Sequence, residues 1–401
     1  MCVNPIYIKA MKKLRVAING CGRIGRAFLR PALERPELEV VAVNDLASRE
    51  GIEYLLKHDT VYGRTGLSLD GIKYLLEKEP SKLPWKELEV DVVVESTGFF
   101  TRAESAKAHI DAGAKRVVIT APIKDSDSPL IKGALPTSSA RGARGEVPSP
   151  RGGGVGAAGG MSKSSDLART NFAEQNLRGR ADSATSFKKG EIAETVLMGL
   201  NEEKLKSCVI SSNASCTTNA ASPIIAILDE AIGIEEAVLN TVHAYTATQA
   251  LVDSPSGRNS MREGRAAAVN IIPSGTGAAI AVTKAYPKLE GKFDGISLRV
   301  PVICGSIADI TFIAKRDTSA EEVNEILRAS AKEARWQGIF SASDDELVSS
   351  DIIGRTEGAI AELSMTRVVG GNLVKVLAWY DNEMGYAATL VRHVIEAGRH
   401  I

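Results

Sequence analysis

The sequence lacks the features that would mark a nucleic-acid-binding, membrane-spanning or disulfide-stabilised protein. It has no net charge, because 49 Lys and Arg residues balance 49 Asp and Glu residues, so no overall field attracts it to nucleic acid or to an anionic membrane. No apolar run approaches the roughly 20 residues that a membrane-spanning helix needs. The five cysteines have no metal-ligand spacing, and an odd number without a framework favours a reducing compartment. We therefore expect a cytoplasmic protein without a metal site.

The length of 401 residues predicts about two domains, and 44% hydrophobic with 24% charged residues is ordinary for a soluble globular enzyme. Residues 1–10 do not resemble a signal peptide. They are either an N-terminal tail or the result of a wrongly assigned start codon, since Met11 begins the more typical N-terminal sequence MKKLRVAING. Residues 128–193 are first rich in Gly, Ala, Pro and Arg and then polar, with few large apolar side chains. We expect them to form an inserted, mostly disordered surface excursion without chemistry of its own.

One stretch, residues 211–219 with the sequence SSNASCTTN, stands between a short apolar strand and a helical run over residues 220–228. Cys216 is therefore expected near a helix N-terminus, where unpaired N–H groups and the positive end of the dipole favour an anion. A thiol there loses its proton more easily, and the thiolate is the reactive form. A buried structural cysteine is the alternative, but its neighbours Ser215 and Thr217 are polar. We interpret Cys216 as a nucleophile.

A glycine-rich turn follows the first predicted strand, residues 14–19. Residues 20–26 read GCGRIGR and open a helix, the arrangement of a dinucleotide-binding turn. The phosphates are expected at the helix N-terminus, where unpaired N–H groups point outward. The three glycines allow a tight turn, close approach of the backbone to a pyrophosphate, and packing of helix on strand; they are Gly20, Gly22 and Gly25.

A second predicted strand, residues 39–45, ends in Asp45, about 20 positions after the last glycine. An acidic residue there accepts hydrogen bonds from the ribose hydroxyls and repels a 2′-phosphate, so the sequence favours NAD over NADP; a plain turn residue is the alternative. Strands over residues 90–95 and 116–120 extend a doubly wound parallel sheet. The residues that follow these strands are candidate cofactor-loop residues, namely Thr97, Gly98, Thr120 and Ala121.

The second half of the chain supplies a candidate base and a candidate phosphate ligand. A strand over residues 237–242 leads to His243, whose imidazole could take the proton of a nucleophilic thiol; a structural histidine is the alternative. Arg299 lies in a predicted strand over residues 297–302. Its planar guanidinium matches phosphate oxygens, although a surface salt bridge would explain it as well. Residues 271–279 predict a helix with Gly and Thr at its start, a second possible anion site.

Later segments predict a second kind of sheet. Strands over residues 307–313 and 373–380 indicate a largely antiparallel sheet, with helices such as residues 320–333 on one face. A final helix is expected over residues 386–398. The predicted fold is therefore α/β, with a Rossmann-type NAD-binding domain and an α+β catalytic domain whose sheet is mostly antiparallel.

Eight motifs in one order closely resemble phosphorylating glyceraldehyde-3-phosphate dehydrogenases, over residues 12–127 and 194–399. They are NGCGRIGR, VAVND, ESTGFFTR, SNASCTTNA, TVHAYTATQ, GRAAAVNIIP, SLRVP and WYDNEMGY. The resemblance implies an NAD-linked, phosphate-dependent oxidation of glyceraldehyde 3-phosphate to 1,3-bisphosphoglycerate by a homotetramer, in glycolysis or gluconeogenesis. We assign residues 11–215 with 382–401 to the NAD-binding domain and residues 216–381 to the catalytic and oligomerisation domain.

The resemblance also implies roles for individual residues. Cys216 is similar to the nucleophile that forms a thiohemiacetal, and His243 to the base that activates it and assists hydride departure. The Cys216 N–H and the His243 ring would stabilise the oxyanion, and phosphate would attack the acyl thioester. Thr246 and Arg299 match the substrate-phosphate site; Ser215, Thr217, Thr276 and Gly277 match the inorganic-phosphate site. The residues that match cofactor contacts are Gly20, Gly22, Arg23, Ile24, Gly25, Asp45, Lys78, Thr97, Gly98, Thr120, Asn382 and Tyr386, and Pro255 accompanies Asp45 in the NAD-preferring form.

Departures from the family pattern concern cofactor affinity and assembly more than the chemistry. Residues 63–77 are shorter than the pattern, so we expect a hairpin on the adenine side to be missing. Residues 128–193 are an insertion relative to the family pattern, and Ile280 stands where Lys is common. The sequence VPVICGSIAD after Arg299 differs from the residues that are usual there. None of these departures removes a named catalytic group.

Two other functions are left open by the sequence. Erythrose-4-phosphate dehydrogenases share the nucleophile and the cofactor domain, although TVHAYTATQ and PSGTGAA look more like the glyceraldehyde enzyme. A non-catalytic protein could use the basic, glycine-rich segment to bind RNA or a protein partner, but the balanced charge gives this no support. We expect neither a nucleic-acid partner nor a membrane.

Overall fold

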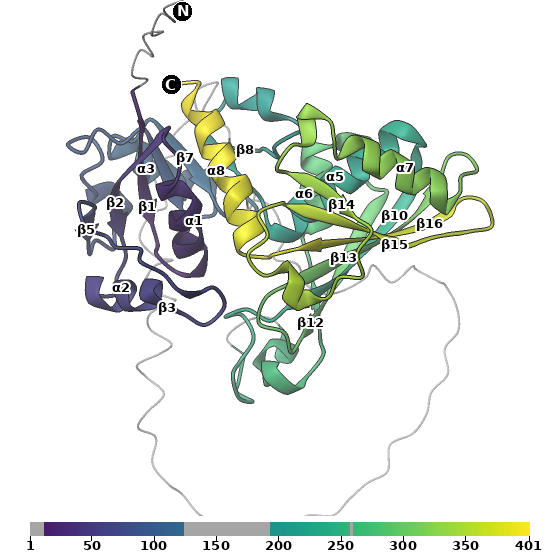
Figure 1. Ribbon diagram of the computed structural model, residues 1–401. Coiled ribbons are helices and arrows are strands. Elements are labelled where there is room, and N and C mark those ends of the chain that lie inside the picture. Colours follow the sequence, from purple (N-terminus) through teal and green to yellow (C-terminus); the bar gives the residue numbers. More distant parts are fainter. Residues whose placement is uncertain (1–11, 124–192, 257–259) are drawn as a thin grey trace, which may run out of the picture. The chain divides into compact units, whose positions relative to one another are not determined.

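The computed structural model describes residues 12–123, 193–256 and 260–401, which belong to one unit of the chain. Their strands form two seven-stranded sheets and one short two-stranded sheet (Figure 1). The expected tail, residues 1–10, lies outside the described residues. So does the expected excursion, residues 128–193, apart from Ala193, which begins a strand.

The first sheet is parallel throughout, in the order β5-β2-β1-β6-β7-β9-β8. Its central strands are buried on both faces, as expected for short runs of Val and Ile covered by helices. The strand order reverses between β1 and β6, and open α/β sheets bind ligands at such a point. The predicted doubly wound sheet is therefore confirmed. Its strands are β1 (Leu14–Asn19), β2 (Leu38–Asn44), β5 (Lys73–Leu75), β6 (Val92–Glu95), β7 (Arg116–Ile119), β8 (Ala193–Thr195) and β9 (Ile210–Ser212), and its helices include α1 (Arg23–Leu33), α2 (Arg49–Lys57) and α3 (Ala103–Asp111).

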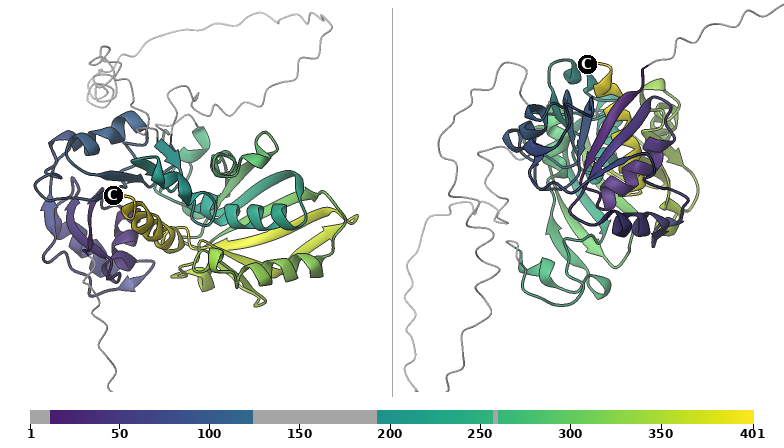
Figure 2. Two further views of the ribbon diagram at one scale, coloured as in Figure 1. Left: turned by 90° about the horizontal axis from the view of Figure 1, so that it is seen from above. Right: turned by 90° about the vertical axis from the view of Figure 1, so that its left-hand side faces the viewer.

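The second sheet is mixed, in the order β11-β12-β10-β13-β16-β15-β14, and four of its six pairings are antiparallel. Along β13 every second residue is buried, the pattern of a strand with one covered face. Helices α5, α6 and α7 pack against the strands of this sheet (Figures 1 and 2). The strands are β10 (Ile234–Ala244), β11 (Ile272–Gly275), β12 (Phe293–Val300), β13 (Ser306–Ala314), β14 (Phe340–Ser343), β15 (Ala359–Val369) and β16 (Leu373–Tyr380), and the helices are α5 (Cys216–Ala231), α6 (Ala278–Ala285) and α7 (Ala320–Ser330).

The last helix, α8 (Met384–Gly398), connects the two sheets. It follows β16 of the second sheet and packs on α1, beside β6 and β7 of the first sheet. Its buried Leu390 and Val394 belong to the same hydrophobic cluster as Phe28 and Leu29 of α1. The end of the chain therefore completes the cover of the first sheet. No helix of the described part is long and apolar enough to cross a membrane.

Element boundaries differ from the expectations near the candidate site. Helix α5 begins at Cys216, four residues before the expected helical run. Strand β10 continues through His243 to Ala244, because both residues pair with β12. The edge strand β11 stands where the start of a helix was expected, and its Pro273 is tolerated because an edge strand has one unpaired side. Residues 65–72 lead from the two-stranded sheet of β3 (His58–Asp59) and β4 (Gly63–Arg64) to β5 without another hairpin.

Candidate active site

The turn between β9 and α5 holds Cys216 at the first position of the helix. Ser215 is the N-cap, and its Oγ accepts a hydrogen bond from Thr218 N at 3.2 Å, which satisfies one unpaired donor of the helix start. Ala214 has a φ of 53°, a conformation that residues other than glycine rarely adopt. Backbone strain of this kind concentrates at functional sites. The expected place of Cys216 at a helix N-terminus is confirmed.

The imidazole of His243 faces the thiol. Its Nε2 lies 3.4 Å from Cys216 Sγ, and its Nδ1 lies 2.6 Å from the carbonyl oxygen of Ala244. A carbonyl oxygen can only accept, so the ring proton is on Nδ1 and the lone pair of Nε2 is directed at the thiol. Tyr380 packs edge-on against the imidazole at 5.9 Å between ring centroids, which helps to fix its orientation.

Arg299 completes this group from the neighbouring strand. It is the register partner of His243 in the parallel pair β10–β12, and its Nη1 lies 2.9 Å from His243 Nδ1 and 3.2 Å from Ala244 O. Because Nδ1 carries a proton, Arg299 donates to the carbonyl. Its Nε is buried and has no hydrogen-bond partner among the described residues. A buried cationic donor without a partner fits an anionic ligand.

Burial raises the pKa of the Cys216 thiol, whereas Arg299 and the Thr217 N–H favour the ionised form without offsetting burial. The expectation of a lowered thiol pKa is therefore wrong as a net effect, although the helix start acts in the expected direction. Burial and then Arg299 lower the pKa of His243 to about 3. At neutral pH the resting pair is a neutral thiol that faces a neutral imidazole, an acid and a base in position for proton transfer.

The hydroxyls expected at the inorganic-phosphate site already have partners within the protein. Thr217 is buried, and its Oγ1 lies 2.9 Å from Tyr380 Oη. Ser215 Oγ is occupied as the N-cap of α5. Thr276 Oγ1 accepts a hydrogen bond from Ala278 N at 3.2 Å at the start of α6, whose N-cap is Gly277. An anion at either helix start would therefore meet backbone N–H groups first.

Arg23 is held by two carboxylates. Its Nη1 donates to Asp59 Oδ2 at 2.8 Å, and its Nε donates to Glu383 Oε1 at 2.8 Å. Glu383 immediately precedes α8, so this ion pair ties the start of α1 to the segment that follows β16. Arg23 and Thr246 also line one cavity of about 340 Å³, so the structure brings a predicted cofactor residue and a predicted substrate residue to one opening.

Two predicted cofactor residues, Asn382 and Tyr386, follow β16 and are buried. Asn382 contacts the second sheet, and Tyr386 contacts the turn before Cys216, which we call the nucleophile turn. Asn382 Oδ1 accepts hydrogen bonds from Ser306 Oγ at 3.0 Å and from Gly305 N at 3.2 Å. Tyr386 Oη donates to Ala214 O at 3.1 Å, directly before Ser215 and Cys216. The start of α8 therefore supports the turn that carries the thiol.

The three glycines of the turn after β1 have three different surroundings. Gly20 has a φ of +94°, and a Cβ there would lie 2.6 Å from Thr97 N. A Cβ on Gly25 would lie 2.2 Å from Gly20 O, so only glycine lets α1 pack this closely. A Cβ on Gly22 would meet nothing within 4 Å, which leaves open space at the N-cap of α1. These are the three conditions that a dinucleotide turn requires.

Two separate models of known families match the two parts of the chain. Residues 14–103 match the NAD binding domain of glyceraldehyde 3-phosphate dehydrogenase, and residues 215–382 match its C-terminal domain. The chain is 36% identical over 393 residues to the glyceraldehyde-3-phosphate dehydrogenase of Clostridium pasteurianum. The aligned residues make up 94% of this chain and 96% of that protein. This chain belongs to the glyceraldehyde-3-phosphate dehydrogenase family. Glyceraldehyde-3-phosphate dehydrogenase 2 of Streptomyces avermitilis and the glyceraldehyde-3-phosphate dehydrogenase of Streptomyces coelicolor are each 37% identical over 402 residues, covering 97% of this chain and 99% of the relative.

The carboxyl edge of the first sheet fits the NAD of this family. Asp45 Oδ2 accepts a hydrogen bond from Cys21 N at 2.6 Å and Oδ1 one from Ala47 N at 2.9 Å, and each oxygen keeps a further lone pair for a ribose hydroxyl. The carboxylate is thereby fixed beside the open N-cap at Gly22. The remaining predicted cofactor residues lie as follows: Thr97 and Gly98 follow β6, Thr120 follows β7, Lys78 is exposed after β5, and Ile24 packs against the core.

A buried carboxylate that no motif in the sequence indicates, Glu95, lies at this edge of the glyceraldehyde-3-phosphate dehydrogenase fold. Glu95 Oε2 accepts hydrogen bonds from Asn19 Nδ2 at 2.6 Å and from His109 Nε2 at 3.0 Å. Trp85 Nε1 donates to His109 Nδ1 at 3.0 Å, which places the ring proton on Nε2. The other oxygen, Oε1, accepts from Thr97 N at 2.9 Å and from the Thr97 hydroxyl. The one available signal was an acidic residue at the end of an otherwise apolar strand.

Polar contacts continue from Asn19 along the same edge. Asn44 Nδ2 donates to Asn19 Oδ1 at 2.7 Å and to Glu77 O at 2.8 Å, and Glu77 N donates to Asn44 Oδ1 at 2.8 Å. The ends of β6, β1 and β2 and the loop before Lys78 are thus joined by one hydrogen-bonded network. Within the described ranges, no group of three or more His, Cys, Asp and Glu side chains could hold a metal ion.

Proposed function

We propose that this chain is a phosphorylating glyceraldehyde-3-phosphate dehydrogenase, which oxidises D-glyceraldehyde 3-phosphate to 1,3-bisphosphoglycerate with NAD and inorganic phosphate. The observation that carries the proposal is the pair formed by the Cys216 thiol, at the start of α5, and His243 Nε2, 3.4 Å away. Family membership supports the reaction and the cofactor.

The first step is nucleophilic attack. His243 Nε2 takes the thiol proton as Cys216 Sγ bonds to the aldehyde carbon, and the carbonyl electron pair moves onto oxygen. The product is a thiohemiacetal. The backbone N–H of Cys216 and the His243 ring stabilise the negative charge that develops on this oxygen. Because the pKa of His243 is lowered to about 3, the ring is neutral throughout the physiological range, and its Nε2 lone pair is not already occupied by a proton.

Oxidation and phosphorolysis follow at the carbon that is bound to Cys216 Sγ. Protonated His243 first returns its proton to the oxyanion, which leaves a hydroxyl group and a neutral ring. A bound NAD would supply the acceptor for the hydride of this carbon. As the hydride leaves, His243 removes the hydroxyl proton, and an acyl thioester remains on Cys216. An oxygen of inorganic phosphate then attacks the thioester carbon, the C–S bond breaks, and the sulfur leaves with the electron pair. His243 returns a proton to that sulfur, which restores the resting thiol.

Two anion sites hold the phosphate groups in this proposal. The substrate phosphate lies at Thr246 and Arg299, whose buried Nε has no partner among the described residues. Inorganic phosphate lies at the starts of α5 and α6, with Ser215, Thr217, Thr276 and Gly277. The hydroxyl contacts of Ser215 and Thr217 within the protein favour backbone N–H groups as the donors there.

NAD is held by the carboxyl edge of the first sheet. Gly22 and the start of α1 take the pyrophosphate, and Asp45 takes the adenosine ribose, which excludes a 2′-phosphate by charge. Arg23, Ile24, Thr97 and Thr120 line the same edge, with Asn382 and Tyr386 toward the nicotinamide. Glu95 fixes the backbone and hydroxyl of Thr97 from below.

We also propose that residues 11–215 with 382–401 form the NAD-binding domain and that residues 216–381 form the catalytic domain. Strands β8 and β9, which precede residue 215, pair within the first sheet, and α8, which follows residue 382, packs on α1. The range that matches the C-terminal-domain model, residues 215–382, supports a boundary near residue 215 and another near residue 382.

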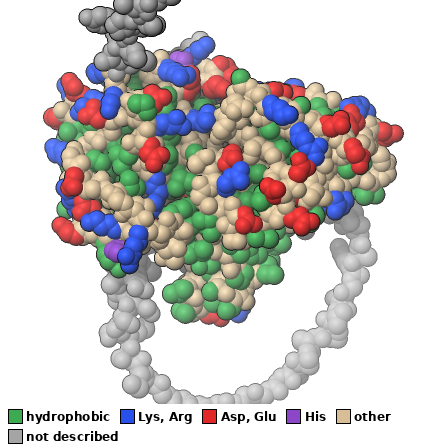
Figure 3. All heavy atoms as spheres, in the orientation of Figure 1, with side chains coloured by type: hydrophobic (Ala, Val, Ile, Leu, Met, Phe, Trp, Pro, Cys, Tyr) green, Lys and Arg blue, Asp and Glu red, His purple; other side chains and the backbone are tan. Residues whose placement is uncertain are grey.

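We propose a cytoplasmic homotetramer. The free state of Cys21, Cys208, Cys216 and Cys304 supports a reducing compartment. Helices cover one face of the second sheet, and Val238 and Ile296 remain 60% and 55% exposed beside a cavity of about 350 Å³. Figure 3 shows hydrophobic side chains gathered near the lower end of the molecule, and a second copy would cover exposed apolar surface of this kind.

The test is formation of NADH from glyceraldehyde 3-phosphate and NAD, with and without inorganic phosphate. Absorbance that depends on phosphate and is lost in C216S supports the proposal, and gel filtration of both proteins verifies that they are folded. A folded wild-type protein without turnover would contradict it. A clear preference for erythrose 4-phosphate over glyceraldehyde 3-phosphate would assign the same chemistry to a different aldehyde.

A further inference from the structure

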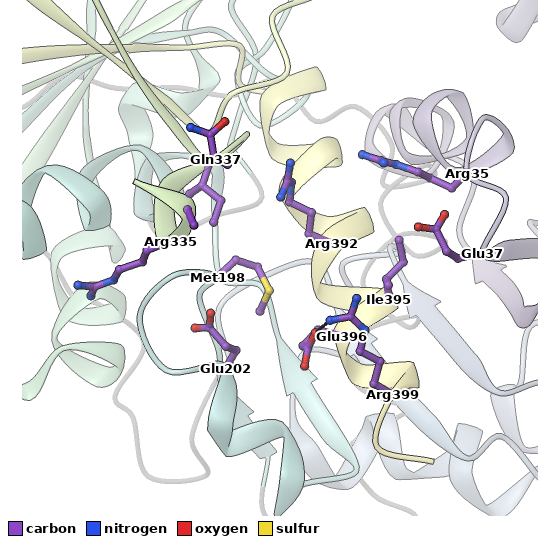
Figure 4. Close-up of a pocket in the computed structure, with 12 residues that line it drawn as sticks. Arg35, Glu37, Met198, Glu202, Arg335, Gln337, Arg392, Ile395, Glu396 and Arg399 are labelled. Carbon is purple, nitrogen blue, oxygen red and sulfur yellow. Dashed lines mark hydrogen bonds and ion pairs between the residues drawn. The ribbon is translucent and has the colours of Figure 1, made fainter. Parts of the chain in front are cut away.

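A cavity of about 280 Å³ lies beside α8 and contains an unusual number of arginines (Figure 4). Arg392 comes from α8, and Arg399 is the C-cap that follows this helix. Arg35 comes from the turn after α1, and Arg335 from the short helical turn Ala334–Trp336. We call this the arginine cavity. It shares no lining residue with the cavity of Arg23 and Thr246.

Two of the four guanidinium groups are neutralised within the protein. Arg335 Nη1 pairs with Glu230 Oε2 at 2.8 Å, and its Nε donates to Gly199 O at 2.6 Å. Arg399 Nη1 pairs with Glu396 Oε2 at 2.6 Å. In contrast, the side chains of Arg35 and Arg392 form no hydrogen bond or ion pair with any residue that the structure describes.

Arg392 is half-buried, and its guanidinium lies against Gly338. A Cβ on Gly338, which has a φ of +67°, would lie 1.9 Å from Arg392 Nη2. Burial and the Arg35 guanidinium lower the pKa of Arg392. Two like charges that approach each other at a partly buried place, with neither of them paired to a carboxylate of the described residues, favour an anion between them.

We propose that the arginine cavity binds a small, hydroxylated phosphate ester, whose phosphate lies between Arg35 and Arg392. A planar guanidinium donates two parallel hydrogen bonds to phosphate oxygens, so two of them satisfy one dianionic group. The volume fits a compact ligand and not a dinucleotide. Glu37 and Glu202 line the same cavity, so they would repel an extended polyanion but accept hydrogen bonds from hydroxyl groups.

The position of the arginine cavity on α8 connects it with the nucleophile turn. His393, the next residue after Arg392, lies with Nε2 2.8 Å from Ser211 Oγ and with Nδ1 3.2 Å from Asn213 Oδ1. Tyr386 of the same helix donates to Ala214 O. A ligand at Arg392 would therefore bind to α8, the helix whose His393 and Tyr386 contact the turn before Cys216. It would not touch the catalytic groups themselves.

The experiment is calorimetric titration of the full-length protein with 2-phosphoglycerol, which carries a phosphate and two hydroxyls but no aldehyde. R35Q and R392Q remove the two proposed ligands. R316Q is the matched control, because Arg316 is exposed and pairs with Glu322 outside the cavity. R299Q removes the guanidinium proposed to hold substrate phosphate, so binding that persists in R299Q belongs to a different site.

We expect 2-phosphoglycerol to bind the wild type, R316Q and R299Q similarly, and R35Q and R392Q at least about tenfold more weakly, as the loss of one charge-assisted contact predicts. Arg35 is exposed, so R35Q tests the site even if R392Q is poorly folded. Unchanged affinity in R35Q would overturn the proposal. So would loss of all binding in R299Q, or equal binding of uncharged glycerol.

Discussion

Arg299 and His243 are register partners on parallel strands, and Nη1 of Arg299 lies 2.9 Å from Nδ1 of His243. Protonation of the imidazole would place two cations side by side, so the guanidinium lowers the pKa of His243 in the same direction as burial does. The Nε of the same Arg299 is buried without a partner among the described residues. One arginine can thus keep the base neutral and bind an anionic substrate.

R299Q separates these two effects. The loss of a charge-assisted contact with the substrate phosphate should lower kcat/KM for glyceraldehyde 3-phosphate by about 10- to 100-fold, chiefly through KM. The pKa of His243 should rise, because a neighbouring cation is gone. Steady-state kinetics as a function of pH measure both effects, with R316Q as the control. An unchanged KM in R299Q would show that the substrate phosphate lies elsewhere.

H243N tests whether Nε2 accepts the thiol proton. Because burial raises the pKa of Cys216, little thiolate forms without a base, and both turnover and alkylation of the thiol by iodoacetamide should slow. The expected loss in kcat is about 10²- to 10⁴-fold, the usual contribution of a general base. H58Q, which alters an exposed histidine on the surface, serves as the control. Alkylation of H243N at the wild-type rate would contradict the assignment of His243 as the base.

Features that depend on local pattern were predictable from the sequence. A strand, a glycine-rich turn, a helix, and a second strand followed by Asp45 occur within about 30 residues, so the cofactor edge is encoded by neighbours along the chain. The place of Cys216 at a helix start follows in the same way, since polar capping residues precede an apolar helical run. Both expectations are confirmed by the positions of β1, α1 and α5.

Features that depend on distant packing were not predictable. The net direction of the Cys216 pKa is set by how far the folded chain removes the thiol from water, and the local sequence contains no measure of this. In the sequence, Glu95 is an ordinary residue at the end of a strand. Its burial and its hydrogen bond with His109, which lies 14 positions later, are determined by the fold. The unpartnered Arg35 and Arg392 are more than 350 positions apart along the chain, a pair that no local pattern can reveal.

E95Q should affect both stability and NAD binding. The Glu95 carboxylate accepts hydrogen bonds from Asn19, His109 and Thr97, and an amide would place its own N–H groups against some of these donors. A loss of about 2 kcal/mol in the free energy of unfolding is expected, because a donor is left unsatisfied in the interior. Displacement of Thr97 should also raise KM for NAD more than KM for the aldehyde.

The control for E95Q is E104Q, which changes an exposed glutamate of α3. Thermal unfolding and initial rates at varied NAD measure the two effects. If E95Q unfolded at the wild-type temperature and kept its KM for NAD, the carboxylate would have no role in the position of the cofactor loop.

Two buried histidines predict the direction of acid destabilisation. Burial lowers the pKa of both His243 and His393 to about 3, from an ordinary value of 6.5. Between these values the unfolded chain binds protons that the folded protein excludes, so stability is complete above pH 6.5 and is lost as the pH falls toward 3. Each histidine contributes a slope of about 1.4 kcal/mol per pH unit in this window.

H393Q tests this slope away from the reacting groups. A glutamine amide can replace the contacts to Ser211 and Asn213, so the variant should fold, and its stability should decline less steeply below pH 6.5 than that of the wild type. Urea unfolding at several pH values measures the difference, with H58Q as the control. A slope equal to that of the wild type would mean that His393 is protonated in the folded protein.

Gly22 and Gly25 lie three residues apart and should respond to alanine in opposite ways. A Cβ on Gly25 would lie 2.2 Å from Gly20 O, so G25A must separate α1 from the turn that follows β1 and should destabilise the protein by several kcal/mol. A Cβ on Gly22 meets nothing within 4 Å, and the φ of −67° at Gly22 suits alanine, so G22A should unfold at the wild-type temperature.

The methyl group of G22A would, however, occupy the open space assigned to the pyrophosphate, and the Kd for NAD should rise by at least about tenfold. Thermal unfolding without NAD and fluorescence titration with NAD distinguish the two effects, and a G22A protein that binds NAD as tightly as the wild type would place the pyrophosphate away from this turn.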